Sequence, residues 1–296
     1  MGTAIQTWQL SKTYRSRAAL APMDLIVPDD VVFGYLGPNG AGKTTTIRLF
    51  AGLLRPTGGR AAVGGFDVVR EREQAQRQIG YLPGDFTAYP RLTAAAYLEH
   101  LGHLRGGPDR ARTRSLADRL DLDLGVRIGA MSHGTRQKVG IVQAFMHSPA
   151  LLVLDEPTAG LDPLVQREFL TLVREAREQG RTVFLSSHNL YEVEAVADMV
   201  GILVRGRLAL VEAVEKLKAQ AVRRIDLTFV GSPPDAMLHR IPAVRDVTVV
   251  GRTAHLVVEG HTTQLLNAAS PYGIEQIVTH EPDLEDVFLS YFDTRE

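Results

Sequence analysis

The chain contains no cysteine among its 296 residues. This excludes disulfide bonds and thiol chemistry, and it suits a reducing compartment. No run of 18 or more apolar residues occurs, so the sequence predicts no membrane-spanning helix. The first residues, MGTAIQTWQLSKTY, lack the apolar stretch that is typical of a signal peptide. Any role at a membrane is therefore expected to depend on a partner.

Excess charge is also missing, since 33 Lys and Arg residues face 34 Asp and Glu residues, for a net charge of −1. Near-neutrality argues against a general nucleic-acid-binding surface, and we expect no nucleic-acid partner. The arginine-rich segment 109–119 alternates in sign, and we interpret it as the solvated face of a helix. The hydrophobic content of 45% is sufficient for a sizeable core. The length predicts one large domain or two unequal ones.

A glycine-rich turn between an apolar strand, expected over 31–36, and a helix carries the strongest signal. It has the form G-x-x-x-x-G-K-T, the P-loop pattern. Glycines let the backbone approach a phosphate closely, and the helix N-terminus adds a positive dipole end. The pattern assigns Lys43 to the β- and γ-phosphates and the Thr44 hydroxyl to Mg²⁺. The predicted nucleotide-binding residues of this segment are Gly37, Pro38, Asn39, Gly40, Ala41, Gly42, Lys43, Thr44 and Thr45.

A second polar cluster follows a short apolar run at 151–154, which is typical of a strand buried on both faces. Asp155 and Glu156 stand at its carboxyl end, the edge where doubly wound sheets bind ligands. With a P-loop upstream, they become the expected Mg²⁺-binding and base positions. Ser132 is placed to cap a helix, and a helix N-terminus bearing a serine hydroxyl and Gly134 can also bind phosphate.

The pattern changes from about residue 221. We predict strands at 223–230, 244–250, 253–258 and 274–280, with helices at 233–240 and 262–271. This β-α-β-β-α-β order resembles a ferredoxin-like unit, and a further helix is expected from Leu284 to Tyr291. The predicted domains are 1–218 and 219–296. For the second we expect dimer contact or regulation, with a purely structural role as the alternative.

Five motifs in fixed order resemble the nucleotide-binding subunit of an ABC transporter over about residues 1–218. They are GPNGAGKTT at 37–45 (Walker A), MSHGTRQ at 131–137 (signature), LLVLDE at 151–156 (Walker B), AGLD at 159–162 (D-loop) and His188 (switch histidine). The closing EPDLEDVF is similar to extensions on drug- and lipid-exporter ATPases of the daunorubicin-resistance type.

The resemblance implies an α/β fold: a P-loop ABC ATPase core with a parallel sheet, an N-terminal antiparallel β subdomain, a helical subdomain at about 86–148, and the small α+β ferredoxin-like domain. It implies MgATP hydrolysis that drives a separate multi-span permease, an exporter, from the cytoplasmic face of the membrane. It also implies a second ATPase subunit, with a homodimer expected.

The same resemblance implies the role of each site residue. Tyr14 stacks on adenine, Thr44 and Asp155 hold Mg²⁺, Glu156 is the base, and His188 contacts the γ-phosphate. Across the dimer, the implied contacts come from Ser132, Gly134 and Gln137 of the signature and Asp162 of the D-loop.

Two departures from the family pattern stand out. In the signature, His133 and Thr135 stand where the common form of the motif has glycine-like residues, whereas Ser132, Gly134 and Gln137 are kept. More important, Gly84 occupies the place of the Q-loop glutamine, which normally contacts Mg²⁺ and the attacking water. Either Asp85 supplies a carboxylate there or solvent completes the shell, and we expect solvent. Two other functions stay open: a soluble non-transport ABC ATPase, and an ATP-regulated binding module with little hydrolysis.

Overall fold

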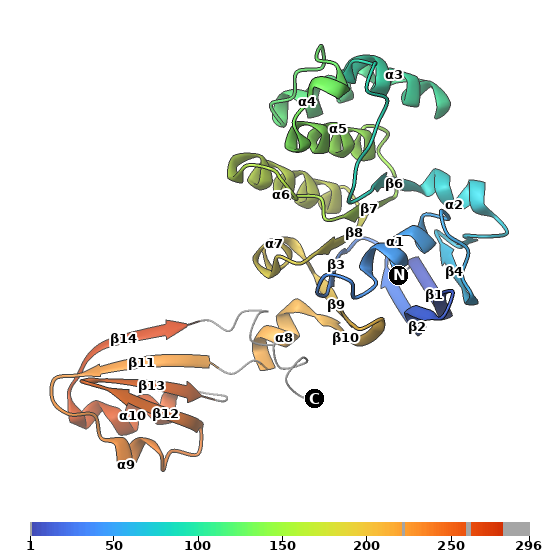
Figure 1. The fold of residues 1–296 in the computed structure, drawn as a ribbon. Helices are drawn as coiled ribbons and strands as arrows, with labels where there is room; N and C mark the ends of the chain where they lie inside the picture. Colours follow the sequence, from blue (N-terminus) through green and yellow to red (C-terminus); the bar gives the residue numbers. More distant parts are fainter. Residues whose placement is uncertain (1, 221–222, 259–261, 281–296) are drawn as a thin grey trace. The chain divides into compact units, whose positions relative to one another are not determined.

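A computed structural model describes residues 2–220, 223–258 and 262–280. The chain forms two compact units, Met1–Ala213 and Val214–Glu296 (Figure 1). The division falls slightly before residue 218, where we placed the domain boundary. Each unit is described by itself.

A six-stranded sheet forms the centre of the first unit, in the order β10-β9-β3-β8-β7-β6. All neighbours are parallel except β10 and β9, which form an antiparallel hairpin. Both faces are covered, which explains why the central strands read as continuous apolar runs. The strands are β3 (Val32–Leu36), β6 (Ile79–Leu82), β7 (Leu151–Asp155), β8 (Thr182–Ser187), β9 (Met199–Val204) and β10 (Arg207–Ala213).

An antiparallel sheet with the order β2-β1-β4-β5 lies beside the first helix. Its strands are β1 (Thr3–Tyr14), β2 (Arg17–Pro28), β4 (Gly58–Val63) and β5 (Phe66–Asp67). The first two are the longest strands in the part of the chain that the structure describes. Shifts of register along the β1–β2 pair interrupt the alternation of buried and exposed residues, so the sequence pattern fades before the strands end. The hairpin carries Tyr14 to the end of β1.

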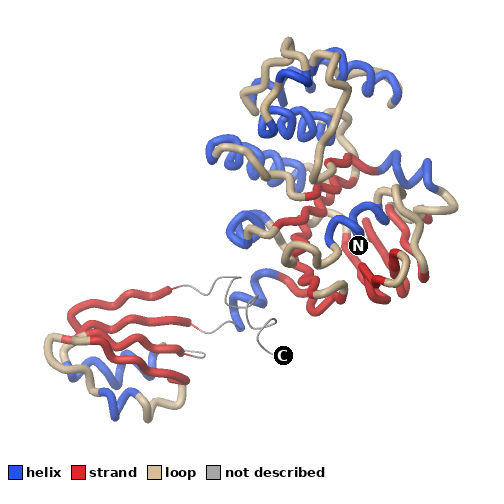
Figure 2. The backbone as a smooth tube through the Cα atoms, in the orientation of Figure 1, coloured by secondary structure: helices blue, strands red, loops and turns tan. Residues whose placement is uncertain are grey.

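Helices flank the central sheet and fill the connection between β6 and β7 (Figure 2). Three of them form the helical subdomain, and side chains of Thr93, Asp109 and Ser132 cap their N-termini. The last of these begins at His133, directly after its predicted cap Ser132. The helices are α1 (Lys43–Phe50), α2 (Arg72–Gln78), α3 (Ala94–Leu104), α4 (Arg110–Arg119), α5 (His133–Phe145), α6 (Pro163–Glu178) and α7 (Leu190–Val196), with a 3₁₀ turn η1 (Ile128–Ala130).

The second unit is a four-stranded antiparallel sheet with two short helices on one face. Its order β12-β13-β11-β14 is that of a ferredoxin-like unit. The predicted final helix at 284–291 lies outside the described residues. The elements are α8 (Val214–Gln220), β11 (Arg223–Phe229), α9 (Asp235–Leu238), β12 (Val244–Val250), β13 (Thr253–Val258), α10 (Thr263–Ala269), η2 (Ser270–Tyr272) and β14 (Ile274–His280).

Within the described residues, no helix combines the length and apolar character needed to cross a bilayer.

An aromatic cluster packs the central sheet against the first helix. The Phe184 ring on β8 stacks on Phe33 at 5.4 Å between centroids, and it contacts Tyr35 and Phe50 at 5.1 and 5.3 Å. The cluster thus joins β3 and β8 to Phe50, the last residue of α1.

We predict that Phe184→Ala lowers the free energy of unfolding by about 3–5 kcal/mol, because it leaves a cavity among rings that cannot collapse. Phe184→Leu should cost less. Leu104→Ala, at a side chain that is 71% exposed, is the control and should change stability by less than about 0.5 kcal/mol. Urea unfolding followed by circular dichroism measures all three. Equal losses in Phe184→Ala and Leu104→Ala would contradict the central role of the cluster.

Candidate functional site

The turn between β3 and α1 requires glycine at several positions. Gly40 and Gly42 have φ of 79° and 112°, in the left-handed region that other residues rarely adopt. A Cβ atom at Gly37 would lie 2.5 Å from the Leu203 carbonyl oxygen, and one at Gly42 would lie 2.5 Å from that of Ala19. The loop is therefore pressed against its neighbours on one side, and its other side lines a cavity.

Lys43, at the start of α1, is buried, with 6% of its side chain exposed. Its Nζ donates to the carbonyl oxygen of Gly37 at 2.6 Å and forms an ion pair with Glu156 Oε1 at 3.2 Å. This ion pair joins the P-loop to the end of β7. It holds a positive charge at the base of the loop, where the sequence places the phosphates.

Glu156 follows β7 with φ of 47°, a strained conformation for a residue with a side chain. Two bonds hold it there, because its N–H donates to Ser186 O and to Ser186 Oγ at 3.2 and 3.1 Å. Its second carboxylate oxygen, Oε2, contacts His188 Nδ1 at 2.7 Å. The carboxylate thus lies between a lysine and a histidine, and its role as a base stays a prediction.

Asp155 is completely buried, and only one of its carboxylate oxygens has a partner among the described residues. Oδ1 accepts from the Ser186 hydroxyl at 2.7 Å, whereas Oδ2 has no partner there. Buried polar atoms are nearly always satisfied, so this oxygen fits a hydrated cation or an ordered water. A Cβ atom at Gly84 would lie 3.2 Å from Oδ2. Gly84, which stands in place of the Q-loop glutamine, therefore lies beside this oxygen.

A cavity of about 760 Å³ opens above the P-loop. It brings together most of the predicted nucleotide-binding residues, with Glu156 on its wall. Tyr14 lines it with a ring that is 44% exposed, as a stacking role requires. Its lining residues are Tyr14, Arg17, Ala18, Ala19, Pro38, Asn39, Gly40, Gly42, Lys43, Thr44, Thr45, Glu156, Arg205 and Gly206.

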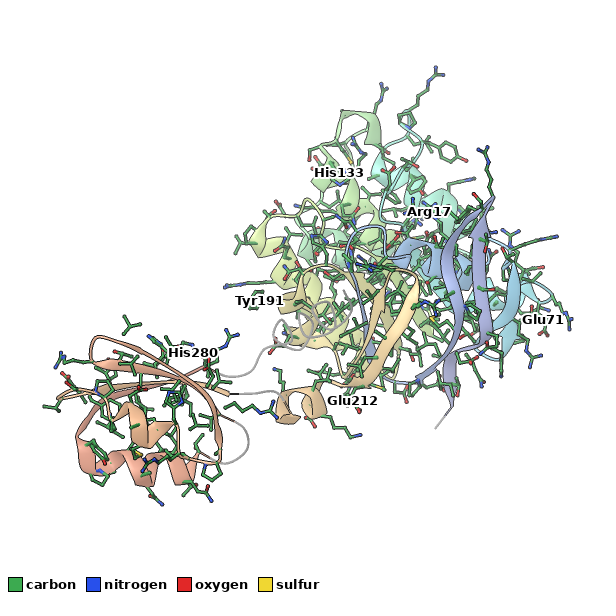
Figure 3. All side chains as sticks on the ribbon, turned by 60° about the horizontal axis from the view of Figure 1, so that its bottom comes forward. Arg17, Glu71, His133, Tyr191, Glu212 and His280 are labelled. Carbon is green, nitrogen blue, oxygen red and sulfur yellow. The ribbon has the colours of Figure 1, made fainter. Side chains whose placement is uncertain are left out.

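Two arginines of this lining were missed by the sequence analysis. Arg17 opens β2 (Figure 3), and Arg205 lies in the β9–β10 turn with φ of 49°. The turn is bound to the P-loop, because Gly206 N–H donates to the Ala41 carbonyl at 2.8 Å. The sequence offered one signal, the pair Arg205-Gly206, which is typical of a two-residue hairpin turn. This pair predicts the turn but does not predict that the turn lies beside the P-loop.

The signature segment lies apart from this cavity within one chain. Ser132 is exposed, and its Oγ accepts from the N–H of Thr135 at 3.1 Å, so it caps α5 as predicted. A Cβ atom at Gly134 would lie 2.4 Å from the Gly160 carbonyl oxygen. The close approach explains the glycine and packs the signature against the D-loop of the same chain.

Gln137 corrects the prediction that the signature glutamine acts on a second subunit. Its side chain is fully buried, and Nε2 donates to the carbonyl oxygens of Glu156 and Pro157 at 3.3 and 3.1 Å. The side chain therefore supports the turn after β7 in its own chain. Residues four apart on a helix share a face, so the exposed His133 does not predict this burial, which follows from the contact of Gln137 with the turn after β7.

Comparisons with known proteins agree with this geometry. The family model described as ABC transporter matches residues 20–159. The chain is 34% identical to the daunorubicin resistance ATP-binding protein DrrA2 of Streptomyces coeruleorubidus, over 97% of this chain and 94% of that protein. The chain belongs to the ABC transporter ATP-binding family.

Two further relatives support the assignment. The linearmycin resistance ATP-binding protein LnrL of Bacillus subtilis (strain 168) is 29% identical over 97% of both chains. A solved structure described as an ATP-binding subunit of an ABC transporter has a TM-score of 0.68 and 30% identity, and it covers 74% of this chain and 93% of its own. The predicted resemblance and the ABC ATPase fold are confirmed, and ATP is the nucleotide that this family binds.

The D-loop aspartate of this ABC protein has a local structural role. Asp162 Oδ1 accepts from the N–H groups of Leu164 and Val165 at 3.1 and 3.0 Å and so caps α6. The hydrogen bond from Val165 lowers the pKa of Asp162, and the charge of Lys138 adds to this. Asp162 is placed on the protein surface near the signature, and its predicted contact across a dimer stays a prediction.

Glu192 is a further polar residue that the sequence analysis did not identify. Its Oε2 accepts from the Thr158 hydroxyl at 2.6 Å and from the Ser187 hydroxyl at 3.5 Å. Its Oε1 accepts from Asn189 Nδ2 at 3.0 Å. Glu192 thereby ties the turn after β7 to the loop that carries His188. It is a positioning residue, since its contacts hold the groups around Glu156 and His188.

We predict that Glu192→Ala lowers kcat for ATP about tenfold, because small misplacements of reacting groups are costly, and leaves KM nearly unchanged. Glu192→Gln keeps an acceptor oxygen for Thr158 and should restore most of the rate. Steady-state ATPase assays, with thermal unfolding as a check on folding, distinguish the variants. A wild-type kcat in Glu192→Ala, or a change confined to KM, would contradict the positioning role.

Proposed function

We propose that this ABC protein binds and hydrolyses MgATP as the nucleotide-binding subunit of a transporter that drives a separate permease. The observation that carries the proposal is the placement of Glu156 on the wall of the P-loop cavity, bonded to both Lys43 and His188. A carboxylate beside the phosphate site is the group that hydrolysis needs.

Nucleotide binding follows from the charges in the cavity. Lys43 forms an ion pair with Glu156 in this structure. A triphosphate carries more charge than one carboxylate, so it draws Lys43 away from Glu156 and onto its β- and γ-oxygens. The carboxylate is then free to interact with water. Tyr14 would stack on the adenine, and Arg17 and Arg205 add positive charge on the same lining.

The residues present fit a magnesium ion. The Thr44 hydroxyl lines the cavity, and Asp155 Oδ2 offers a buried oxygen that has no partner in the described structure. Thr44 would hold the ion directly and Asp155 through water. When bound, Mg²⁺ neutralises charge on the phosphates.

Hydrolysis then depends on Glu156 and His188. Glu156 orients the attacking water and accepts its proton while the new bond to the γ-phosphorus forms and the bond to the β–γ bridging oxygen breaks. In this proposal His188, bonded to Glu156 at 2.7 Å, holds this carboxylate in position and contacts the γ-phosphate. Lys43 stabilises the charge on the phosphate oxygens.

One chain supplies half of the site. Ser132 and Gly134 lie outside the lining of their own cavity, so we propose that they contact ATP bound to a second copy arranged head to tail. The N-terminus of α5 brings positive potential to that contact. We place the dimer on the cytoplasmic face of the membrane, held by an exporting permease, because DrrA2 and LnrL carry resistance in their names.

Gly84 favours one second function, an ATP-regulated module with little hydrolysis. An ATPase assay of the purified chain, with and without a permease, separates the two. Co-purification with a membrane permease would likewise separate the transporter from a soluble ABC ATPase.

We predict that Glu156→Gln lowers kcat by about 10²–10⁴-fold, the usual contribution of a general base. ATP affinity should rise, because the amide no longer competes for Lys43. ATP should then trap a dimer that size-exclusion chromatography detects. Glu178→Gln, on the exposed end of α6, is the matched control. Wild-type turnover in Glu156→Gln would reject its assignment as the base.

We also predict that Asp85→Ala keeps basal, Mg²⁺-dependent ATPase activity within a few-fold of wild type. Asp85 is exposed, and moving it toward Asp155 and Glu156 would cost about 1–4 kcal/mol per close pair of like charges. Activity is measured over a magnesium titration. Lost activity that added Mg²⁺ restores would show that Asp85 has taken over the role of the missing glutamine.

A further inference from the structure

A second cavity, of about 340 Å³, lies between α4 of the helical subdomain and α6 of the core. It shares no lining residue with the nucleotide cavity. Figure 1 shows the three helices α4, α5 and α6 in sequence above the central sheet. The lining residues are Ala111, Arg112, Ser115, Leu116, Arg119, Phe145, Leu172, Glu175, Ala176, Gln179 and Arg181.

The apolar part of this cavity is formed by core side chains. Leu116, Phe145, Leu172 and Ala176 are each at most 4% exposed. They come from α4, α5 and α6, so the cavity extends inward to the point where the three helices meet. An occupant would bury an apolar body against these side chains.

One arginine of the cavity already holds carboxylates. Arg119 donates through Nη1 and Nη2 to the two oxygens of Glu175, at 2.6 and 2.9 Å, and through Nε to Glu168 at 2.5 Å. This bidentate ion pair, the Arg119 fork, joins the helical subdomain to the core. It also neutralises Glu175, the acidic residue of the lining.

The other two arginines are not neutralised in this way. Arg112 Nε donates to the Phe145 carbonyl at 3.1 Å, and Arg181 Nη2 donates to Gln179 Oε1 at 2.5 Å. Among the described residues, neither forms an ion pair with a carboxylate. Burial and the charge of Arg112 lower the pKa of Arg181. Two like charges therefore share a partly buried space, an arrangement that a bound anion would relieve.

We propose that this cavity binds a small amphipathic anion, an apolar body that carries a carboxylate or phosphate group held by Arg112 and Arg181. Both guanidinium groups keep free donors for the planar oxygens of such a group. The apolar body lies against the helices, and the charged end lies at the arginines.

The position of the cavity lets one ligand contact both the helical subdomain and the core. Arg112 belongs to the helical subdomain, and Arg181 directly precedes β8, the strand that carries Ser186 behind the catalytic carboxylates. A shared anion adds a connection between these two parts, parallel to the Arg119 fork. Binding should therefore stabilise the first unit against thermal unfolding.

Most residues of segment 109–119 are exposed, as the interpretation as a solvated helix face predicts, but one side of the helix faces the cavity. Arg112 and Arg119 are seven residues apart, on the side of α4 that faces the cavity, together with Ser115 and Leu116. Arg114 lies on the exposed side. The same helix thus offers a matched control.

The test uses the full chain saturated with MgADP, which occupies the nucleotide cavity. The probes are 1-naphthoate and 1-naphthyl phosphate, with the neutral 1-naphthalenemethanol as the apolar control and inorganic phosphate as the charge-only control. Titration calorimetry and the shift in unfolding temperature measure binding to wild type, to the double variant Arg112→Gln and Arg181→Gln, and to Arg114→Gln.

We expect one or both anionic naphthyl probes to bind wild type and Arg114→Gln equally, and the double variant at least about tenfold more weakly, since charge-assisted hydrogen bonds are lost. A preference for one probe identifies the head group. The proposal is overturned if neither anionic probe binds, or if the neutral probe binds with the same affinity as the anionic probes. It is also overturned if the double variant retains full affinity. Competition by MgADP would place the probe in the nucleotide cavity and would also overturn it.

Discussion

The ion pair between Lys43 and Glu156 is the interaction on which the arrangement of the site depends. It links the helix that follows β3 to the turn that follows β7, although the two residues are far apart in the sequence. Because Lys43 is buried, its charge needs a partner whenever phosphate is absent. The same carboxylate that supplies this partner is the one to which we assign the role of base. Nucleotide binding and the release of Glu156 are therefore one event in the proposed mechanism.

The strained turn after β7 is maintained by residues behind it. Ser186 bonds to both Asp155 and Glu156, Gln137 holds the carbonyls of the turn, and Glu192 joins Thr158 to the loop of His188. Each contact is made by the end of a strand or the start of a helix. The rigid sheet thereby fixes carboxylates that would otherwise repel one another.

Arginines connect the helical subdomain to this core at the opposite end of β8. Arg119 reaches the acidic side chains of α6, and Arg181 stands at the beginning of the strand. The subdomain that carries the signature is thus attached through charged contacts at the rim of a cavity. Such contacts respond to anions, whereas the apolar packing of the Phe184 ring does not.

The sequence by itself determined the P-loop, the strand that ends in Asp155 and Glu156, the cap at Ser132 and the succession of strands and helices along the second unit. These follow from short patterns whose chemistry needs neighbouring residues. Only the tertiary structure decided that Gln137 turns inward, that Arg205 reaches the nucleotide cavity, and that Glu192 supports His188. Those contacts join residues that are distant in the chain. The spacing of apolar residues predicts which face of an element a residue occupies, but it does not predict which residue from another element lies opposite. The loss of the Q-loop glutamine was visible in the sequence, but its nearness to the open oxygen of Asp155 depends on how β6 lies beside β7.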